Sequence, residues 1–252
     1  MTGKKKRRSL YYLFTLLLVG LLGILIYQLE LLPGQQFVLH REFGIRIPEG
    51  YLIHGIDVSH HQGKISWKHV RDMNVDGIKI GFAIIKATEG ENWTDRQFKR
   101  NWTETRKHSI PRGAYHFFIP GRSGISQANR FIRTVKLLPG DLPPVLDIEE
   151  SYGASENTVR TGVSQWLARV ESYYKIKPII YTNPSFYRKF LKGHFDEYPL
   201  WIAHYRLKTK PRIEPWLMWQ HSETGKVNGI NTKVDFNVFS GDSIAFRNLL
   251  IQ

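Results

Sequence analysis

The sequence predicts an α/β fold, namely a distorted TIM-type (β/α) barrel with eight strands and about five helices, preceded by one N-terminal transmembrane helix. Three observations predict it. Eight short apolar or β-branched runs occur after residue 50, helical apolar spacing separates several of them, and one long uncharged run precedes them all. The chain has 252 residues, 42% of them hydrophobic, so it can bury one sizeable core in a single domain.

The N-terminal segment starts with a run of five cations over residues 4–8, followed by an uncharged apolar stretch over residues 10–27. This stretch is just long enough to cross a hydrocarbon core of about 30 Å. The cations before it favour a cytoplasmic N-terminus, which leaves the rest of a single-pass membrane protein in the periplasm or at the cell surface. A cleaved signal peptide is the rival interpretation, but no small-residue cleavage site follows the run.

Four segments follow from this pattern: a basic tail over residues 1–9, an anchor over 10–30, a connector over 31–48 and a barrel domain over 49–252. The connector mixes Pro, Gly, charged and scattered apolar residues without a sustained period.

Eight candidate strands follow the connector, and they occupy residues 52–57, 82–87, 113–118, 143–149, 178–182, 200–205, 217–221 and 234–239. Apolar residues recur at helical spacing over 125–138 and 159–174, and strands that alternate with helices predict a parallel sheet. The last gaps are too short for a helix with two loops, so we expect the final crossovers to be irregular. An open doubly wound sheet is the alternative, although the early glycine-rich phosphate motif of such folds is absent.

Composition excludes several kinds of chemistry. The chain has no cysteine, which rules out disulfides, thiolate zinc sites and a catalytic thiol. Its formal net charge of +14 suits an anionic partner, whether a nucleic acid, an anionic lipid or a carboxylate-bearing cell-wall polymer. No nucleic-acid-binding motif occurs, so we expect no nucleic-acid partner.

Polar residues close the candidate strands, at the end where active sites of such barrels lie. The sharpest group is the Asp147-Ile148-Glu149 segment, which follows a proline-led apolar run. Strand side chains alternate between faces, so Asp147 and Glu149 point the same way, with Cα atoms about 6.5 to 7 Å apart. When two such carboxyls share one cavity, the charge of one raises the pKa of the other, so that one stays protonated while its neighbour is ionised. Cleavage of a glycosidic bond requires this division of roles.

Two other interpretations remain open from the residues alone. His54, His60 and His61 surround Asp57, and a set of His and carboxylate ligands is what a metal-dependent polysaccharide deacetylase would use. A sugar-binding domain without catalysis is the other alternative. The carboxylates at several strand ends argue against it, because a binding protein does not need a proton donor.

Eight segments of the chain resemble glycoside hydrolase family 25, the lysozymes often called the Chalaropsis type. They include GIDVSHHQG at 55–63, IKATEG at 85–90, RGAYHFF at 112–118, VLDIE at 145–149 and LWIAHY at 200–205. The remaining segments are IYTN at 180–183, WQ at 219–220 and VDFN at 234–237. Together they cover about 190 residues in the right order, which is essentially everything after the connector.

The resemblance implies hydrolysis of the β-1,4 bond between N-acetylmuramic acid and N-acetylglucosamine in peptidoglycan. It implies that Glu149 is the general acid, and that Asp147 stabilises the developing positive charge or orients the acetamido group of the substrate. Asp57 and Asp235 resemble the outer carboxylates of the same site. With them we expect Tyr115, Tyr181, Tyr205 and Gln220 to contact the glycan strand, with no metal ion and no cofactor.

Overall fold

The computed structural model describes residues 14–21, 36–205, 209–213 and 215–252. The chain divides into two compact units, Met1–Gln36 and Phe37–Gln252. In the first unit, residues 14–21 form a helix whose apolar side chains are exposed. Most of the predicted anchor lies outside the described residues. Among those described, no helix is both long and apolar enough to cross a membrane.

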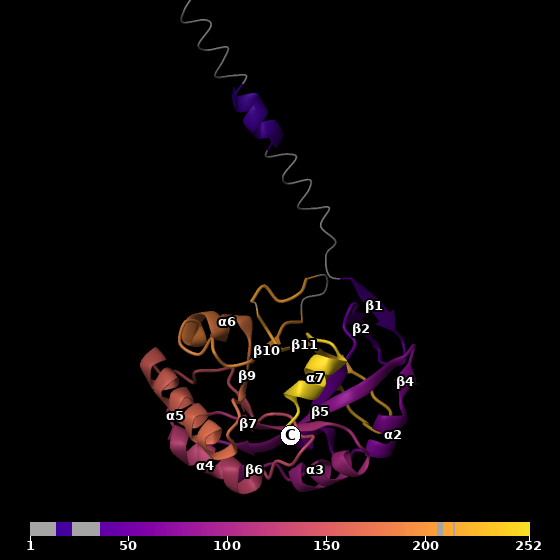
Figure 1. Cartoon of the computed structure of the whole chain (residues 1–252), viewed down its shortest axis with the longest axis vertical. Coiled ribbons are helices and arrows are strands. Elements are labelled where there is room, and N and C mark those ends of the chain that lie inside the picture. The colour runs from indigo at the N-terminus through magenta and orange to yellow at the C-terminus, as the bar shows by residue number, and fades with distance from the viewer. Residues whose placement is uncertain (1–13, 22–35, 206–208, 214) are drawn as a thin grey trace, which may run out of the picture. The chain divides into compact units, whose positions relative to one another are not determined.

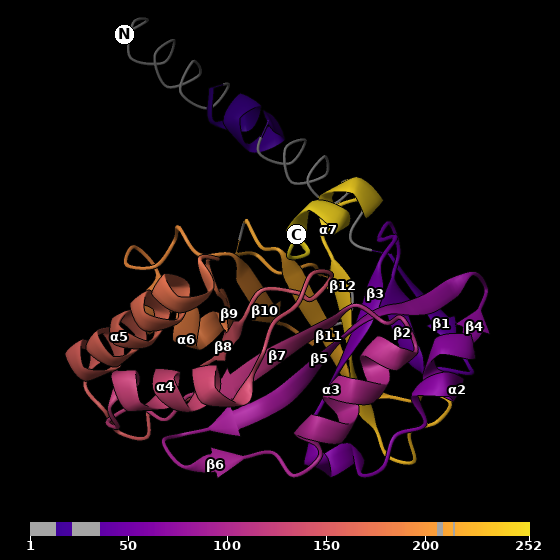
Figure 2. The ribbon, with the colours of Figure 1, turned by 60° about the horizontal axis from the view of Figure 1, so that its bottom comes forward.

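Eight strands of the larger unit form a closed barrel, because the first of them pairs with both the second and the last. Figures 1 and 2 show helices along a large part of their outer side. In chain order the strands are β3 (His54–Val58), β5 (Ile78–Glu89), β7 (Arg112–Phe117), β8 (Val145–Asp147), β9 (Ile179–Thr182), β10 (Leu200–Ala203), β11 (Met218–Gly225) and β12 (Val234–Phe239). Each contains part of one predicted strand, so the eight-stranded barrel is confirmed.

The last strand departs from the parallel sheet that the sequence predicted. All neighbours from β3 through β11 are parallel, whereas β12 runs antiparallel to both β11 and β3. The reason is the short loop over residues 226–233. A parallel return requires a crossover of a dozen or more residues, and this loop allows only a hairpin.

Helices cover the outside of the barrel, and the three longest of those described lie between residues 98 and 174. The described elements are α2 (Trp67–Asp72), α3 (Phe98–Lys107), α4 (Gly124–Thr134), α5 (Glu156–Tyr174), α6 (Pro184–Phe186), the π-helical turn η2 (Tyr187–Leu191), α7 (Ser243–Leu249), the 3-10 turn η1 (His60–Gln62), and the short strands β4 (Asn74–Val75) and β6 (Trp93–Thr94). Serine caps start α4 and α5, where the Ser123 and Ser155 hydroxyls accept backbone N–H groups. The predicted irregular crossovers are confirmed between β9 and β10 and between β11 and β12.

A hairpin occupies much of the segment that the sequence analysis described as a connector. Strands β1 (Phe37–His40) and β2 (Ile45–Pro48) pair with each other and belong to the larger unit. Phe43 is fully buried, and its ring lies 5.1 Å from that of Phe236 on β12. The alternation of buried Ile45 and Ile47 with exposed Arg46 is too short for its period to stand out in the sequence.

Alternating side chains fill the barrel and also pack its outside. On β5, Phe82 and Ile84 belong to the interior cluster, while Ala83 and Ile85 belong to the larger cluster between strands and helices. Lys86 continues the inward alternation and lines the cavity at the mouth. Apolar side chains therefore fill the barrel interior beneath the cavity, and polar residues gather around the cavity itself.

Close packing at the barrel seam predicts a stability effect. A Cβ atom added at Gly55 would lie 2.4 Å from the ring of Phe82, which is fully buried. We expect Gly55→Ala to lower the free energy of unfolding by about 1–3 kcal/mol in urea denaturation, because the ring has no space into which to move. Gly81→Ala is the matched control, since its nearest contacts would be 3.3 Å away. Equal stability of the two variants would contradict this account of the seam.

Candidate active site

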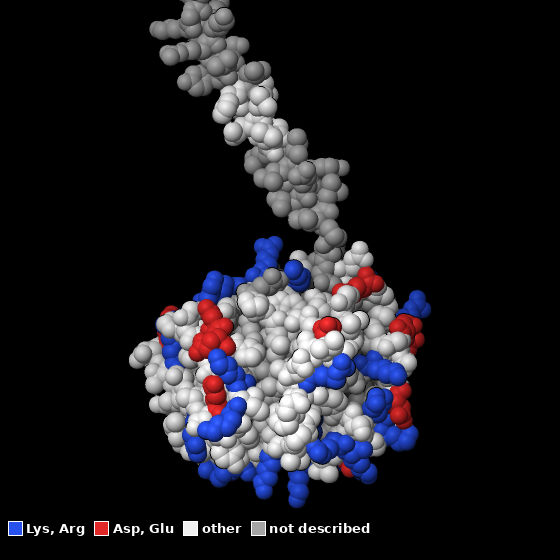
Figure 3. Space-filling view, in the orientation of Figure 1, with Lys and Arg blue, Asp and Glu red and all other residues white. Residues whose placement is uncertain are grey.

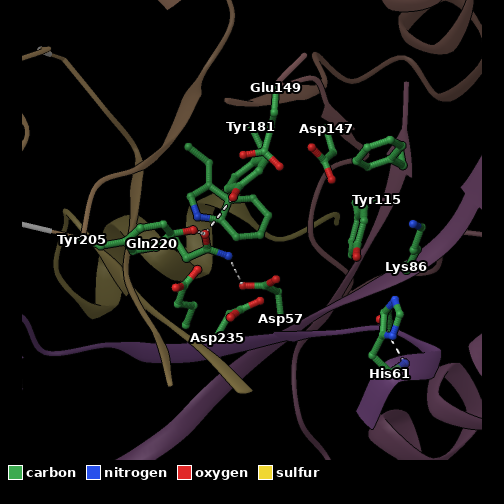
Figure 4. A pocket seen from close by; sticks show the side chains of 14 residues that line it. Asp57, His61, Lys86, Tyr115, Asp147, Glu149, Tyr181, Tyr205, Gln220 and Asp235 are labelled. Atoms are coloured by element: carbon green, nitrogen blue, oxygen red, sulfur yellow. Dashed lines mark hydrogen bonds between the residues drawn. The ribbon is translucent and has the colours of Figure 1, made fainter. Parts of the chain in front are cut away.

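An open cavity of about 390 Å³ lies at the C-terminal ends of the barrel strands (Figure 4). All eight residues that the sequence predicted for the site line this cavity: Asp57, Tyr115, Asp147, Glu149, Tyr181, Tyr205, Gln220 and Asp235. Strand register brings them together, because Asp147 is level with Tyr181 on the next strand and Asp57 with Asp235.

The predicted carboxyl pair sits where β8 ends. Asp147 is the last residue of the strand and only 7% exposed, while Glu149 is half-buried nearer the rim. The Asn183 side chain donates to the Glu149 carbonyl at 3.2 Å and holds this part of the backbone. Asp147 Oδ1 is buried without a hydrogen-bond partner among the described residues. Both carboxyls face the same cavity, as the alternation of strand side chains predicted (Figure 4).

Burial raises the pKa of both carboxyls. Loss of water raises the pKa of Glu149 to about 7, the charges of Asp57 and Glu150 act in the same direction, and Tyr181 opposes them through a hydrogen bond. Burial and then the charge of Glu149 raise the pKa of Asp147 well above its usual range, against the effect of Lys86. The pair therefore keeps a proton near neutral pH, and Glu149 is the member placed at the rim where a leaving group can reach it.

A second pair of carboxyls faces the first from the barrel seam. Asp57 Oδ2 accepts hydrogen bonds from Gln220 Nε2 and Asn237 Nδ2, both at 2.8 Å. Burial, then the charge of Asp57 and a hydrogen bond to it, raise the pKa of Asp235 to about 9. Burial also raises the pKa of Asp57, while its hydrogen bonds to Asn237, Gln220 and Asp235 lower it. The raised pKa thus favours the protonated form of Asp235, while the two N–H donors of Gln220 and Asn237 favour the charged form of Asp57.

The glutamine between the two tyrosines has a determined orientation. Its Oε1 accepts from the Tyr181 hydroxyl at 2.7 Å and from the Tyr205 hydroxyl at 2.5 Å. Its amide N–H groups are therefore directed at Asp57 (Figure 4). The Tyr181 ring also packs edge-on against Trp201 at 4.5 Å. This network gives the wall of the cavity a single arrangement of donors and acceptors.

The residues of the site that the sequence did not assign include Asn237, Lys86 and Glu223. Asn237 shares a strand face with Asp235, so period-two alternation contained the signal for its position. Lys86 ends the inward alternation of β5, and its ammonium lies 2.7 Å from Glu89 Oε2 and 4.6 Å from the Phe117 ring centroid. Glu223 had no usable signal, because the register of β11 shifts between Gln220 and Ser222 just before it.

The histidines do not converge as metal ligands. His54 Nε2 lies 3.0 Å from the Tyr51 carbonyl, and burial lowers its pKa to about 4. His60 Nδ1 pairs with Asp95 Oδ2 at 2.9 Å, while His61 lines the cavity. Within the described ranges, no group of three or more His, Asp or Glu is arranged to hold a metal ion. The geometry therefore does not favour the deacetylase alternative.

Comparison with known proteins decides the family. The sequence profile described as "Glycosyl hydrolases family 25" matches residues 56–230, which include the barrel from β3 to β11 and the carboxyl pair. The chain belongs to glycosyl hydrolase family 25. It is therefore a glycoside hydrolase, and the family that the sequence motifs resembled is confirmed.

Relatives of this family 25 chain agree in sequence and in fold. YegX of Escherichia coli K12 is 49% identical over 80% of this chain and 74% of its own length, and Lysozyme M1 of Streptomyces globisporus is 37% identical over 76% and 69%. Among solved structures, a family 25 glycosyl hydrolase from Bacillus anthracis has a TM-score of 0.74 at 33% identity, covering 85% of this chain and all of its own. A bacterial lysozyme from Streptomyces coelicolor has a TM-score of 0.71 at 36% identity, covering 78% and 96%.

The electrostatics of this family 25 site predict a pH dependence. The raised pKa of Glu149 keeps its proton up to a pH of about 7, so we expect hydrolysis to decline as the pH rises through that value. Asp57→Asn removes a nearby negative charge and should lower the pKa of Glu149, which carbon-13 NMR of labelled glutamate carboxyls can measure. Tyr173→Ala, at the far end of α5, is the control. A Glu149 pKa unchanged by Asp57→Asn would contradict the assigned cause.

Proposed function

We propose that this chain is a lysozyme that hydrolyses the β-1,4 bond between N-acetylmuramic acid and N-acetylglucosamine in peptidoglycan. The observation that carries the proposal is the protonatable Glu149 beside the buried Asp147 at the mouth of a family 25 barrel. The names of its relatives support the substrate: they include Lysozyme M1 and an N,O-diacetylmuramidase of Chalaropsis that is 29% identical over 73% of this chain and 96% of its own length.

Each carboxyl has a role in the proposed reaction. Glu149 donates its proton to the leaving oxygen, because it is half-buried at the rim and its pKa lies near neutral pH. Asp147 lies deeper, where it stabilises the positive charge that develops on the sugar ring or orients the substrate's acetamido group. Asp57, held by two N–H donors, and the neutral Asp235 bind the sugar from the opposite wall.

The charge of the domain suits a polymer that carries carboxylates. Residues 64–136 hold fifteen Lys and Arg but only six Asp and Glu, and these residues include α2, α3 and α4. Figure 3 shows blue side chains gathered along the lower edge of the molecule in that view, where Figure 1 places α3 and α4. Peptide stems of peptidoglycan are acidic, so this side of the barrel attracts the substrate toward the enzyme.

Loss of the acid tests the function directly. We expect Glu149→Gln to lower turnover on purified peptidoglycan by at least about 100-fold without changing the melting temperature by more than a few degrees, because only the proton donor is lost. Mass spectrometry of borohydride-reduced products should show new muramic acid termini from the wild type, unaffected by EDTA. If the wild type sediments with the wall but forms no new ends, the non-catalytic binding alternative replaces this proposal.

We also propose that residues 10–30 anchor the enzyme in a membrane, with the N-terminus cytoplasmic and the barrel in the periplasm or at the cell surface. The uncharged run over residues 10–27 and the cations before it support the anchor and its orientation. In the described stretch 14–21 the chain is helical with exposed apolar side chains, which is compatible with contact to lipid.

Cell fractionation tests the anchor. We expect the full chain to stay in the membrane pellet after washes with high salt and carbonate and to enter the soluble fraction with detergent, because its apolar helix is in lipid. Deletion of residues 1–30 should release an active enzyme. A full chain found in the soluble fraction, or one whose mature N-terminus lies near residue 30, would contradict the proposal.

A further inference from the structure

A second cavity, of about 400 Å³, lies directly beside the candidate active site. We call it the rim cavity; it lies between the segment that follows β8 and the α6–η2 segment, and Glu149 lines both it and the main cavity. The residues of the rim cavity that carry the argument are Tyr152, Asn183 and Lys189. The two cavities therefore adjoin at Glu149.

Tyr152 presents an aromatic ring on the wall of the rim cavity in a backbone conformation that costs energy. It is 58% exposed, and its φ of +48° lies in the left-handed region, where a residue with a side chain is disfavoured. Partial burial and then the charges of Glu150, Glu89, Asp147 and Glu149 raise the pKa of Tyr152. A large exposed ring held this way beside a glycosidase site is a platform for a sugar face.

Lys189 lies on the opposite wall, on a rigid element. It is exposed on the π-helical turn η2, a rare element that often occurs at functional sites. Arg160 of α5 donates to the carbonyls of Phe190 at 2.9 Å and Lys189 at 3.2 Å, which fixes the turn. The Asn183 side chain links the two walls through the carbonyl of Glu149. The Lys189 ammonium lies 4.9 Å from the centroid of the Phe190 ring, and both residues line the rim cavity.

We propose that the rim cavity binds the leaving-group side of the glycan, with a sugar ring stacked on Tyr152 and a stem-peptide carboxylate paired with Lys189. This inference rests on the proposed lysozyme function. The acid must touch the leaving oxygen, so the sugar that carries this oxygen begins at Glu149. The rim cavity is the adjoining space that its continuation enters. Binding energy gained there favours substrates that continue past the cleaved bond and carry peptides.

Matched glycan strands test the assignment. Peptidoglycan strands that carry their stem peptides are compared with the same strands stripped of peptides by an amidase. We expect Tyr152→Ala to lower kcat/KM on both substrates by about 3- to 10-fold, since it removes the ring that stacks on the sugar. Lys189→Gln should lower kcat/KM by about 2- to 5-fold on peptide-bearing strands alone. The controls Tyr173→Ala and Lys175→Gln, exposed residues elsewhere on the domain and outside the cationic side, should match the wild type.

Failure of this inference and failure of the lysozyme function give different results. If the wild type cleaves the strands but Tyr152→Ala equals its control, or if Lys189→Gln affects both substrates equally, the rim-cavity assignment is overturned. Co-sedimentation of stripped strands with Glu149→Gln protein, alone and combined with Tyr152→Ala, measures binding without cleavage. Weaker binding of the double variant supports the assignment even where no cleavage occurs, and equal binding overturns it. Thermal melts confirm that each variant is folded.

Discussion

The site depends on how Asp57 is held where the barrel closes. Its buried carboxylate accepts one N–H from Gln220 on β11 and one from Asn237 on β12, so a single charge on β3 joins the three strands of the seam. Because the side-chain N–H of Gln220 donates to Asp57, its side-chain oxygen faces the other way and accepts hydrogen bonds from the hydroxyls of Tyr181 and Tyr205. The orientation of the two tyrosine hydroxyls is thus linked to the Asp57 carboxylate through Gln220.

Electrostatic strain within the mouth is what makes the chemistry possible. Five carboxyls line one cavity, and the pKa values of Asp57, Asp147, Glu149 and Asp235 are raised chiefly because burial disfavours the charged form. Folding at neutral pH therefore holds protons that the unfolded chain would release, so these groups contribute less to stability as the pH rises through their folded pKa values. The same burial keeps a proton on Glu149 near pH 7. The charge of Lys86 offsets part of the repulsion between Asp147 and Glu149.

Function is distributed along a path and not confined to one pocket. The main cavity holds the two carboxyl pairs, the rim cavity continues beyond Glu149, and the cationic side with α2, α3 and α4 faces outward. Such an arrangement suits a long anionic polymer. Many weak contacts away from the cleaved bond position the polymer, and they do so without strengthening ground-state binding at the reacting atoms. A membrane anchor, as proposed for residues 10–30, would hold the two cavities and the cationic side near the peptidoglycan.

The sequence by itself indicated the eight strands and the Asp147–Glu149 pair, because strand alternation and position at a strand end are local properties that a one-dimensional pattern records. The resemblance of its motifs to family 25 indicated the other residues expected at the mouth. It did not reveal the β1–β2 hairpin, because the contact of the buried Phe43 with Phe236 exists only in the folded barrel. Nor did it reveal the antiparallel β12, the role of Asn237 or the rim cavity beside Tyr152. Closure of the barrel decided these, since contacts between residues about 180 positions apart, such as Asp57 with Asn237, exist only once the chain has folded.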